Sequence, residues 1–85
     1  METPKHLIKG SKVALRLWDE TNVHDKAPVS RDYETAGYVL EGTATLEMNG
    51  KKQTLNQGDS YLVPAGATHT YEIPGRFRAI EATSV

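Results

Sequence analysis

Glycines divide the second half of the sequence into short segments of nearly equal length. Gly42, Gly50, Gly58 and Gly66 recur every eight residues, and Pro74-Gly75 follows at nearly the same interval. Segments of this length are too short for ordinary helices. Turn residues at this spacing are typical of antiparallel sandwiches and barrels. The sequence therefore predicts an all-β fold.

The segments between the turns have the composition of strands. Both residues of Asn49-Gly50 tolerate positive φ, which a two-residue type I′ hairpin requires, so a hairpin is expected there. Val13, Leu15 and Leu17 alternate with Ala14, Arg16 and Trp18, the period of a strand. The strands expected are 13–18, 33–41, 43–48, 51–55, 60–63, 68–73 and 77–82. The residues expected in the core are Leu15, Leu17, Val39, Leu46, Leu62, Val63, Ile73, Phe77 and Ile80.

The whole chain, 1–85, is expected to form one domain, because it is shorter than the length at which chains divide. Residues 1–12 are interpreted as an N-terminal arm. Residues 19–32 contain several charges and few apolar side chains, and are predicted to be a long loop. Loops of this length in small domains are often functional.

Composition excludes several classes of function. The chain has no cysteine, which excludes disulfides, thiolate catalysis and thiolate metal sites. Ten basic and eleven acidic residues give a net charge of −1 without a basic stripe, so no nucleic-acid partner is expected. No apolar run has the length of a membrane span or a signal peptide, so a cytoplasmic protein with no membrane partner is expected. A domain this small buries only about 60–65% of its unfolded surface, which favours a homodimer.

A motif runs from Gly58 to His69. A Gly-Asp turn is followed by a short apolar strand, by Pro64 and Gly66, and then by His69 at the start of the next strand. This segment resembles the second motif of the cupin superfamily at each fixed position up to the histidine, and Ile73 stands where that family often has asparagine. Tyr38–Gly42 resembles the end of the first cupin motif. The resemblance covers roughly residues 30–82 and implies a single jelly-roll, or double-stranded β-helix, barrel with a small ligand or metal ion in its mouth.

The resemblance also implies a set of metal ligands. Metal-binding cupins hold Fe, Mn, Ni, Cu or Zn through two histidines and a glutamate of the first motif and the histidine of the second. His69 matches the last of these, and Glu34 lies within one residue of the expected glutamate. The two histidine positions fall within Pro28–Arg31, which contains no histidine. His24 in the predicted loop is the third candidate ligand.

Strand parity decides which of these side chains face the interior. If Val39 points inward, then Gly37, Thr35 and Tyr33 do so too, while Glu34 points outward. A β-bulge between Glu34 and Tyr38 would reverse this.

Two further residues are candidates for binding an organic ligand. Tyr71 lies on the same strand face as His69. Arg31 stands near a first-motif histidine position and could bind a carboxylate or phosphate through two parallel hydrogen bonds. The alternative for Arg31 is a surface ion pair with Asp32 or Glu34.

Three functions remain open from the sequence. The first is a barrel that binds a small molecule in its mouth, with a degraded or absent metal site. The second is a metal-dependent oxygenase or isomerase that uses His69, Glu34 and His24. The third is a non-catalytic structural barrel that is packed solid and forms oligomers. The absence of the first-motif histidines favours the first, and a fold that hosts many activities does not select one.

Overall fold

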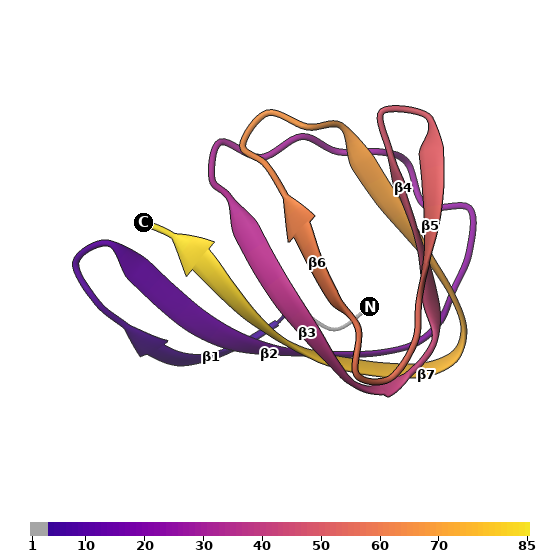
Figure 1. Cartoon of the computed structure of the whole chain (residues 1–85), viewed down its shortest axis with the longest axis horizontal. Helices are drawn as coiled ribbons and strands as arrows, with labels where there is room; N and C mark the ends of the chain where they lie inside the picture. Colours follow the sequence, from indigo (N-terminus) through magenta and orange to yellow (C-terminus); the bar gives the residue numbers. More distant parts are fainter. Residues whose placement is uncertain (1–3) are drawn as a thin grey trace.

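A computed structural model describes residues 4–85 and shows an all-β protein. Its seven strands are β1 (Lys5–Lys9), β2 (Val13–Val23), β3 (Thr35–Gly42), β4 (Ala44–Met48), β5 (Lys51–Leu55), β6 (Ser60–Val63) and β7 (His69–Ser84). Figure 1 shows most of them curling around a common interior, with the β4–β5 hairpin rising at one side and the β1–β2 hairpin extending away at the other. Within residues 4–85, no helix has the length and hydropathy needed to cross a membrane. The predicted all-β fold is confirmed.

The strands pair antiparallel throughout. One set has the order β1-β2-β7-β3-β6, and β4 joins the first part of β7 on one side and β5 on the other. β7 is therefore common to both sets of strands. The β4–β5 hairpin turns at Asn49 and Gly50, with φ values of 52° and 82°, as the predicted type I′ turn requires.

The predicted turn at Pro74-Gly75 does not reverse the chain. The first part of β7, His69 to Glu72, pairs with β4, whereas Ile73 pairs with the end of β2 and the residues from Arg76 onward pair with β2 and β3. Proline has no N–H to offer a ladder, and it is found in sheets at bulges and edges. The dipeptide therefore marks the corner at which one long strand passes from one set of strands to the other.

Two further boundaries differ from the sequence prediction. The predicted arm 1–12 contains a strand, β1, which pairs with the start of β2. Residues 1–3 of that arm lie outside the described residues. The predicted loop 19–32 is replaced in its first part by β2, which continues to Val23 along the edge of β7. The connection between β2 and β3 therefore runs from residue 24 to 34.

The core lies inside the curl. It consists of Trp18, Val39, Ala44, Leu46, Leu55, Tyr61, Val63, Ile73, Phe77 and Ala79. Five of the nine predicted core residues are buried: Val39, Leu46, Val63, Ile73 and Phe77. The prediction was wrong for Leu15, Leu17 and Ile80, which are only partly buried, and for Leu62, which is half exposed. For Leu15 and Leu17 the physical reason is that β2 turns its other face inward, so Ala14, Trp18 and Glu20 are the buried residues of that strand. Leu62 and Ile80 alternate with buried neighbours on β6 and β7 and therefore point outward.

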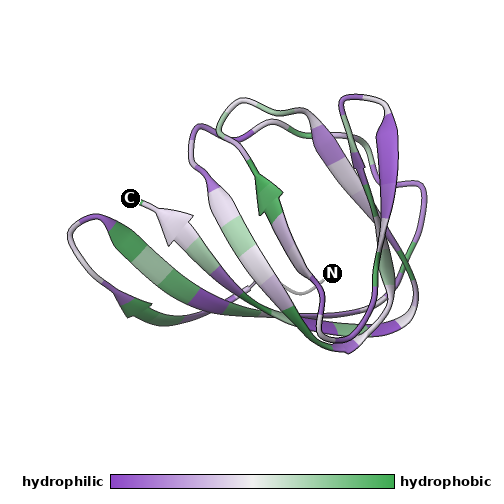
Figure 2. Cartoon of the chain, in the orientation of Figure 1, coloured by the Kyte–Doolittle hydropathy of each residue, from purple (hydrophilic) through white to green (hydrophobic). Residues whose placement is uncertain are grey.

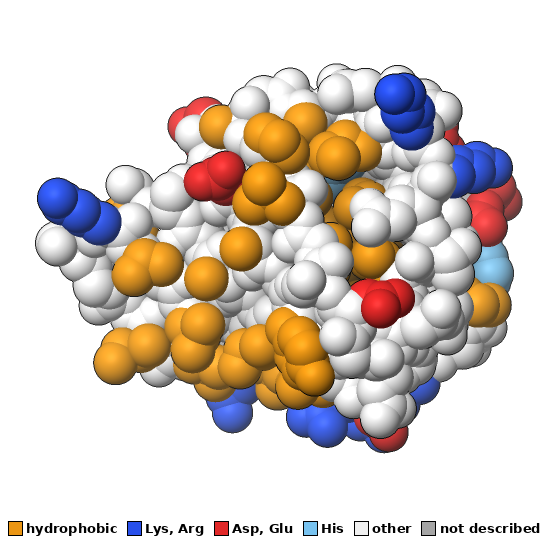
Figure 3. All heavy atoms as spheres, in the orientation of Figure 1, with side chains coloured by type: hydrophobic (Ala, Val, Ile, Leu, Met, Phe, Trp, Pro, Cys, Tyr) orange, Lys and Arg blue, Asp and Glu red, His pale blue; other side chains and the backbone are white. Residues whose placement is uncertain are grey.

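The outward face of the larger sheet carries apolar side chains in register. Leu15, Ala82, Ala36 and Leu62 form one row across four strands, and Leu17, Ile80 and Tyr38 form the next. Figure 2 shows the β1–β2 hairpin and the end of β6 as hydrophobic. Figure 3 shows hydrophobic side chains gathered over this side of the molecule. These two rows are called the outer apolar face below.

The charges beside the outer apolar face neutralise one another. Asp19 lies 3.3 Å from Arg76 and 3.5 Å from Arg78, and Glu41 lies 3.8 Å from Arg76. Two arginines thus face two carboxylates, so this group of four side chains carries no net charge. We propose that a second copy of the chain covers it, because a small domain lacks buried surface and an equally apolar face is the complementary one.

Leu62→Lys tests this homodimer. We expect the parent chain to sediment as a dimer at high micromolar concentration and the variant as a monomer, because a lysine buried within the contact would lose its hydration. Thr54→Lys, an exposed position on β5, is the matched control and should leave the dimer intact. A parent chain that sediments as a monomer at this concentration would contradict the proposal.

Candidate functional site

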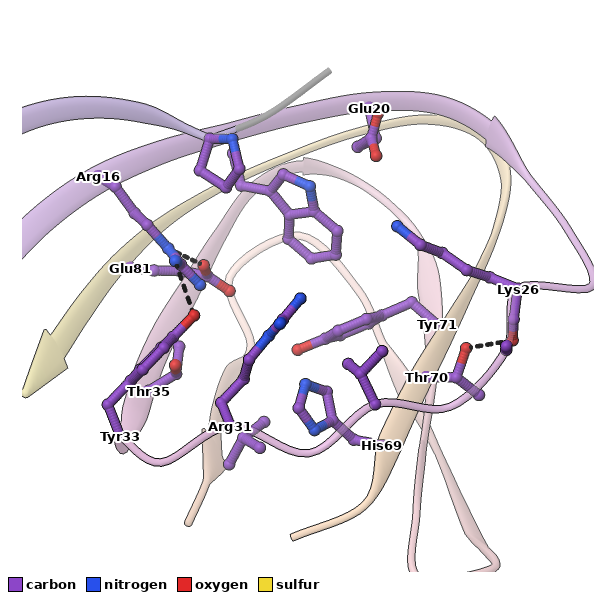
Figure 4. A pocket seen from close by; sticks show the side chains of 15 residues that line it. Arg16, Glu20, Lys26, Arg31, Tyr33, Thr35, His69, Thr70, Tyr71 and Glu81 are labelled. Atoms are coloured by element: carbon purple, nitrogen blue, oxygen red, sulfur yellow. Dashed lines mark hydrogen bonds and ion pairs between the residues drawn. The ribbon is translucent and has the colours of Figure 1, made fainter. Parts of the chain in front are cut away.

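A cavity of about 280 Å³ opens at one end of the barrel. Its walls come from β2, from the 24–34 connection and from both parts of β7. Its apolar lining includes Trp18, Val29, Val63 and Tyr71. Its polar lining includes Arg16, Glu20, Lys26, Arg31, Tyr33, His69 and Glu81. Figure 4 shows most of the polar groups directed toward a common space.

A row of polar residues crosses four strands at one side of the cavity. Arg16 of β2 faces Glu81 of β7, which faces Gly37 of β3, which faces Tyr61 of β6. The Glu81 side chain is 2% exposed and accepts hydrogen bonds from Arg16 Nε at 2.8 Å and from the Tyr61 hydroxyl at 2.5 Å. These bonds to an ionised acceptor are of the stronger class. Together they compensate the burial of the carboxylate.

Gly37 makes this arrangement possible. The Tyr61 ring lies across the Gly37 backbone on its way to Glu81. A Cβ at position 37 would stand 2.1 Å from Tyr61 Cζ and 2.5 Å from its hydroxyl oxygen, far inside van der Waals contact. Only a residue without a side chain permits the tyrosine to reach the carboxylate from β6.

The groups around Glu81 are held in single protonation states. Burial raises the pKa of Tyr61 well above its ordinary value, and the charge of Glu81 raises it further. Burial alone would lower the pKa of Arg16, but the Glu81 carboxylate and hydrogen bonds with Tyr33 and Glu81 outweigh it and raise this pKa. Arg16 also donates to the Tyr33 hydroxyl at 3.4 Å and lies 5.7 Å from the centre of its ring. The row is therefore an arginine cation, a neutral tyrosine and the carboxylate between them.

Aromatic rings form the inner wall. Trp18 packs edge-on against Tyr71, with ring centres 4.6 Å apart, and against Phe77 at 5.4 Å. Burial raises the pKa of Tyr71 and the charge of Glu81 adds to the effect, so its hydroxyl stays protonated. Such a wall suits a flat or apolar ligand body.

His69 stands at the mouth of the cavity. Its Nδ1 lies 2.9 Å from the carbonyl oxygen of Ala67, and this acceptor assigns the proton of the neutral ring to Nδ1. Its backbone exchanges two hydrogen bonds with Val29, at 2.9 Å and 2.8 Å. This pair fastens the 24–34 connection to β7 across the mouth.

The structure brings three of the five sequence-predicted site residues together. His69, Tyr71 and Arg31 all line the cavity. Glu34 and His24 are exposed and are not among the lining residues. Thr35, Gly37 and Val39 are buried and Glu34 is not, so β3 follows the parity without a bulge before Tyr38.

The residues present do not fit the implied four-ligand metal site. Within residues 4–85, no group of three or more His, Cys, Asp or Glu side chains could hold a metal ion. The backbone of Glu34 is tied to Ser84 by hydrogen bonds of 2.8 Å and 2.9 Å on the outside of the barrel. His69 therefore has neither the first-motif histidines nor this glutamate beside it.

Sequence reasoning missed the residues of the polar row and the Trp18 wall. It placed Leu15 and Leu17 inside and so sent Arg16 and Trp18 outward. Two signals were available. Glu81 has the strand parity of Phe77, which was expected in the core, and Gly37 interrupts an otherwise β-prone strand. A glycine at such a position often marks a close approach by a neighbouring group.

Comparison with known proteins agrees with this fold. The sequence matches the family described as Cupin domain over residues 22–83, most of its length. The chain belongs to the cupin family. This cupin is also 42% identical over 38 residues to mannose-1-phosphate guanylyltransferase ManC of Salmonella typhimurium, a match covering 45% of this chain and 8% of that enzyme.

Solved cupin-like structures share its fold. The EutQ protein of Clostridium difficile superposes with a TM-score of 0.85 at 19% identity, over 95% of this chain and 60% of that one. A cupin superfamily protein of Desulfitobacterium hafniense has a TM-score of 0.84 at 22% identity, over 98% and 76% of the two chains. KdgF from Halomonas sp. has a TM-score of 0.83 at 19% identity, over 95% and 76%. At these identities the likeness establishes the jelly-roll fold alone.

Gly37→Ala tests the polar row. We expect the free energy of unfolding to fall by about 3 kcal/mol, because the methyl group displaces Tyr61 and leaves Glu81 short of a donor. Urea unfolding gives the value. At the matched position Gly75, no atom lies within 4 Å of where a Cβ would stand, so Gly75→Ala should change stability by less than about 0.5 kcal/mol. Equal losses in the two variants would contradict this account.

The raised tyrosine pKa values predict a loss of stability at high pH. Unfolded tyrosines ionise near a pKa of about 10, while Tyr61 and Tyr71 stay protonated in the fold. Their contribution is intact below about pH 10 and is lost as pH rises further, at up to roughly 1.4 kcal/mol per pH unit for each residue.

Urea midpoints measured from pH 8 to about pH 11.5 check this. Tyr71→Phe should reduce the loss of unfolding free energy above about pH 10 by the contribution of one tyrosine, up to roughly 1.4 kcal/mol per pH unit. Tyr38→Phe is the control, at a tyrosine outside the cavity that is half exposed in the single chain, measured at a concentration at which the chain is monomeric. An alkaline slope unchanged by Tyr71→Phe would count against the assignment.

Proposed function

We propose that this cupin binds a small organic molecule in the mouth of its barrel without a metal ion held by the protein. The cavity carries the proposal: about 280 Å³ of open space with an aromatic wall on one side and several polar groups on the other. Ligand sites commonly combine an apolar lining with a few placed polar groups. A barrel that served only as a structural unit would not need this space, so the cavity argues against the packed-solid alternative.

The scarcity of metal-ligating side chains around His69 supports a site that binds its ligand without a metal ion. A transition metal needs several imidazole or carboxylate ligands, and His69 lacks the partners that the cupin pattern supplies. The polar row does not provide them, since Glu81 is already bonded to Arg16 and Tyr61. Arg31, Tyr71 and His69 are left to contact a ligand directly.

Trp18 makes the proposal testable without a label. It is the only tryptophan of the chain and lines the cavity, so its fluorescence should respond to occupancy. We expect at least one class of small organic compound to change the emission saturably. Val29→Phe, which fills part of the cavity, should weaken that binding by roughly tenfold or more, since a crowded pocket loses the contacts of the ligand body. Val85→Phe, at an exposed valine, is the matched control.

Elemental analysis of the purified protein tests whether the site is free of metal. Near-stoichiometric metal in protein purified without added metal or a histidine tag, and its loss in His69→Ala, would contradict a metal-free site. It would favour the metal-dependent alternative, and Glu34 and His24 would then be the next residues to test. An emission response equally strong in Val29→Phe and the parent would contradict binding in this cavity.

A further inference from the structure

Arg31 is an exposed residue of the 24–34 connection whose guanidinium points into the cavity. Its backbone carbonyl accepts a hydrogen bond from Gly66 N at 2.7 Å, and two residues earlier Val29 is paired with His69. Its guanidinium has no ion-pair or hydrogen-bond partner among residues 4–85. Figure 4 shows Arg31, Tyr71 and His69 directed into the same part of the cavity. The backbone is thus held at two points while the guanidinium donors remain available.

The charges lining the cavity leave one positive charge in excess. Arg16, Lys26 and Arg31 contribute three positive charges and Glu20 and Glu81 two negative ones, which leaves +1 with His69 counted as neutral. Arg16 and Glu81 satisfy each other at 2.8 Å. A monoanion would neutralise the cavity, whereas a phosphate dianion would leave it negative.

The remaining space limits the size and character of the anion. At roughly 30 Å³ for each water-sized group, a cavity of 280 Å³ holds about nine such groups. Trp18, Tyr71, Val29 and Val63 present rings and methyl groups to it. The body of the ligand is therefore apolar or aromatic and small.

We propose that this site binds a small aromatic or apolar monocarboxylate, with Arg31 holding the carboxylate and the Trp18–Tyr71 wall holding the body. The planar guanidinium offers two parallel N–H donors that match the two carboxylate oxygens, a geometry that lysine cannot reproduce. This inference rests on the proposed function and adds the chemical class of the ligand.

Benzoate and benzamide provide the test, because they have the same shape and about nine non-hydrogen atoms each and differ in charge. We expect Trp18 emission and calorimetry to show benzoate binding, and benzamide binding roughly 10- to 100-fold more weakly, the range of one charge-assisted hydrogen bond. Arg31→Gln should abolish this preference by weakening benzoate alone, and Arg31→Lys should restore it only in part. Arg76→Gln, the same change at an exposed arginine outside the cavity, should leave it unchanged.

Three results would overturn the proposal. Equal binding of benzoate and benzamide in the parent would show an apolar site without carboxylate recognition, and the proposed function would stand. If inorganic phosphate binds more tightly than benzoate, and if this binding is lost in Arg31→Gln, the cavity is a phosphate site instead. No binding of any compound of this size would remove both the carboxylate inference and the proposed function.

Discussion

The buried carboxylate of Glu81 is the constraint on which the structure depends. A carboxylate removed from water costs several kcal/mol unless partners replace its hydration. Here the partners come from both sides of β7, Arg16 from β2 and Tyr61 from β6, and Tyr61 reaches it only over Gly37 of β3. A slip of β2 by one residue would bring a leucine opposite the charge, so the row specifies the register of four strands.

The same row separates two kinds of charge in the cavity. Arg16 is committed to Glu81 and Tyr33, so its charge serves the fold. Arg31 comes from the 24–34 connection, whose backbone is tied to the barrel, and its guanidinium faces the open space. Because the structural ion pair is internally neutral, the excess charge of the cavity resides with the groups near its mouth. The fold is thus stabilised by Arg16, and the proposed carboxylate recognition depends on a different arginine, Arg31.

Much of the fold was predictable from sequence, because turn chemistry is local. The glycine spacing, Asn49-Gly50 and the Gly58–His69 motif located the central strands and placed His69 at the cavity. The inward face of β2 was not predictable by hydrophobicity, because that strand has leucines on one side and Arg16, Trp18 and Glu20 on the other. Strand parity also shows that the predicted core list was inconsistent. Leu62 and Val63 are adjacent, and Phe77 and Ile80 are three apart, so on regular strands neither pair can be buried together. The Arg16–Glu81 contact joins residues 65 positions apart, which no local pattern reveals.

The path of β7 has a consequence for the dimensions of the cavity. His69 and Tyr71 lie before the Pro74-Gly75 corner and Glu81 lies after it, on one continuous strand. The distance from the mouth to the buried row is therefore set by covalent geometry and one bend, and not by how tightly two separate sheets pack. A change in the bend angle at Pro74-Gly75 would therefore change the size of the cavity without replacing any residue that lines it.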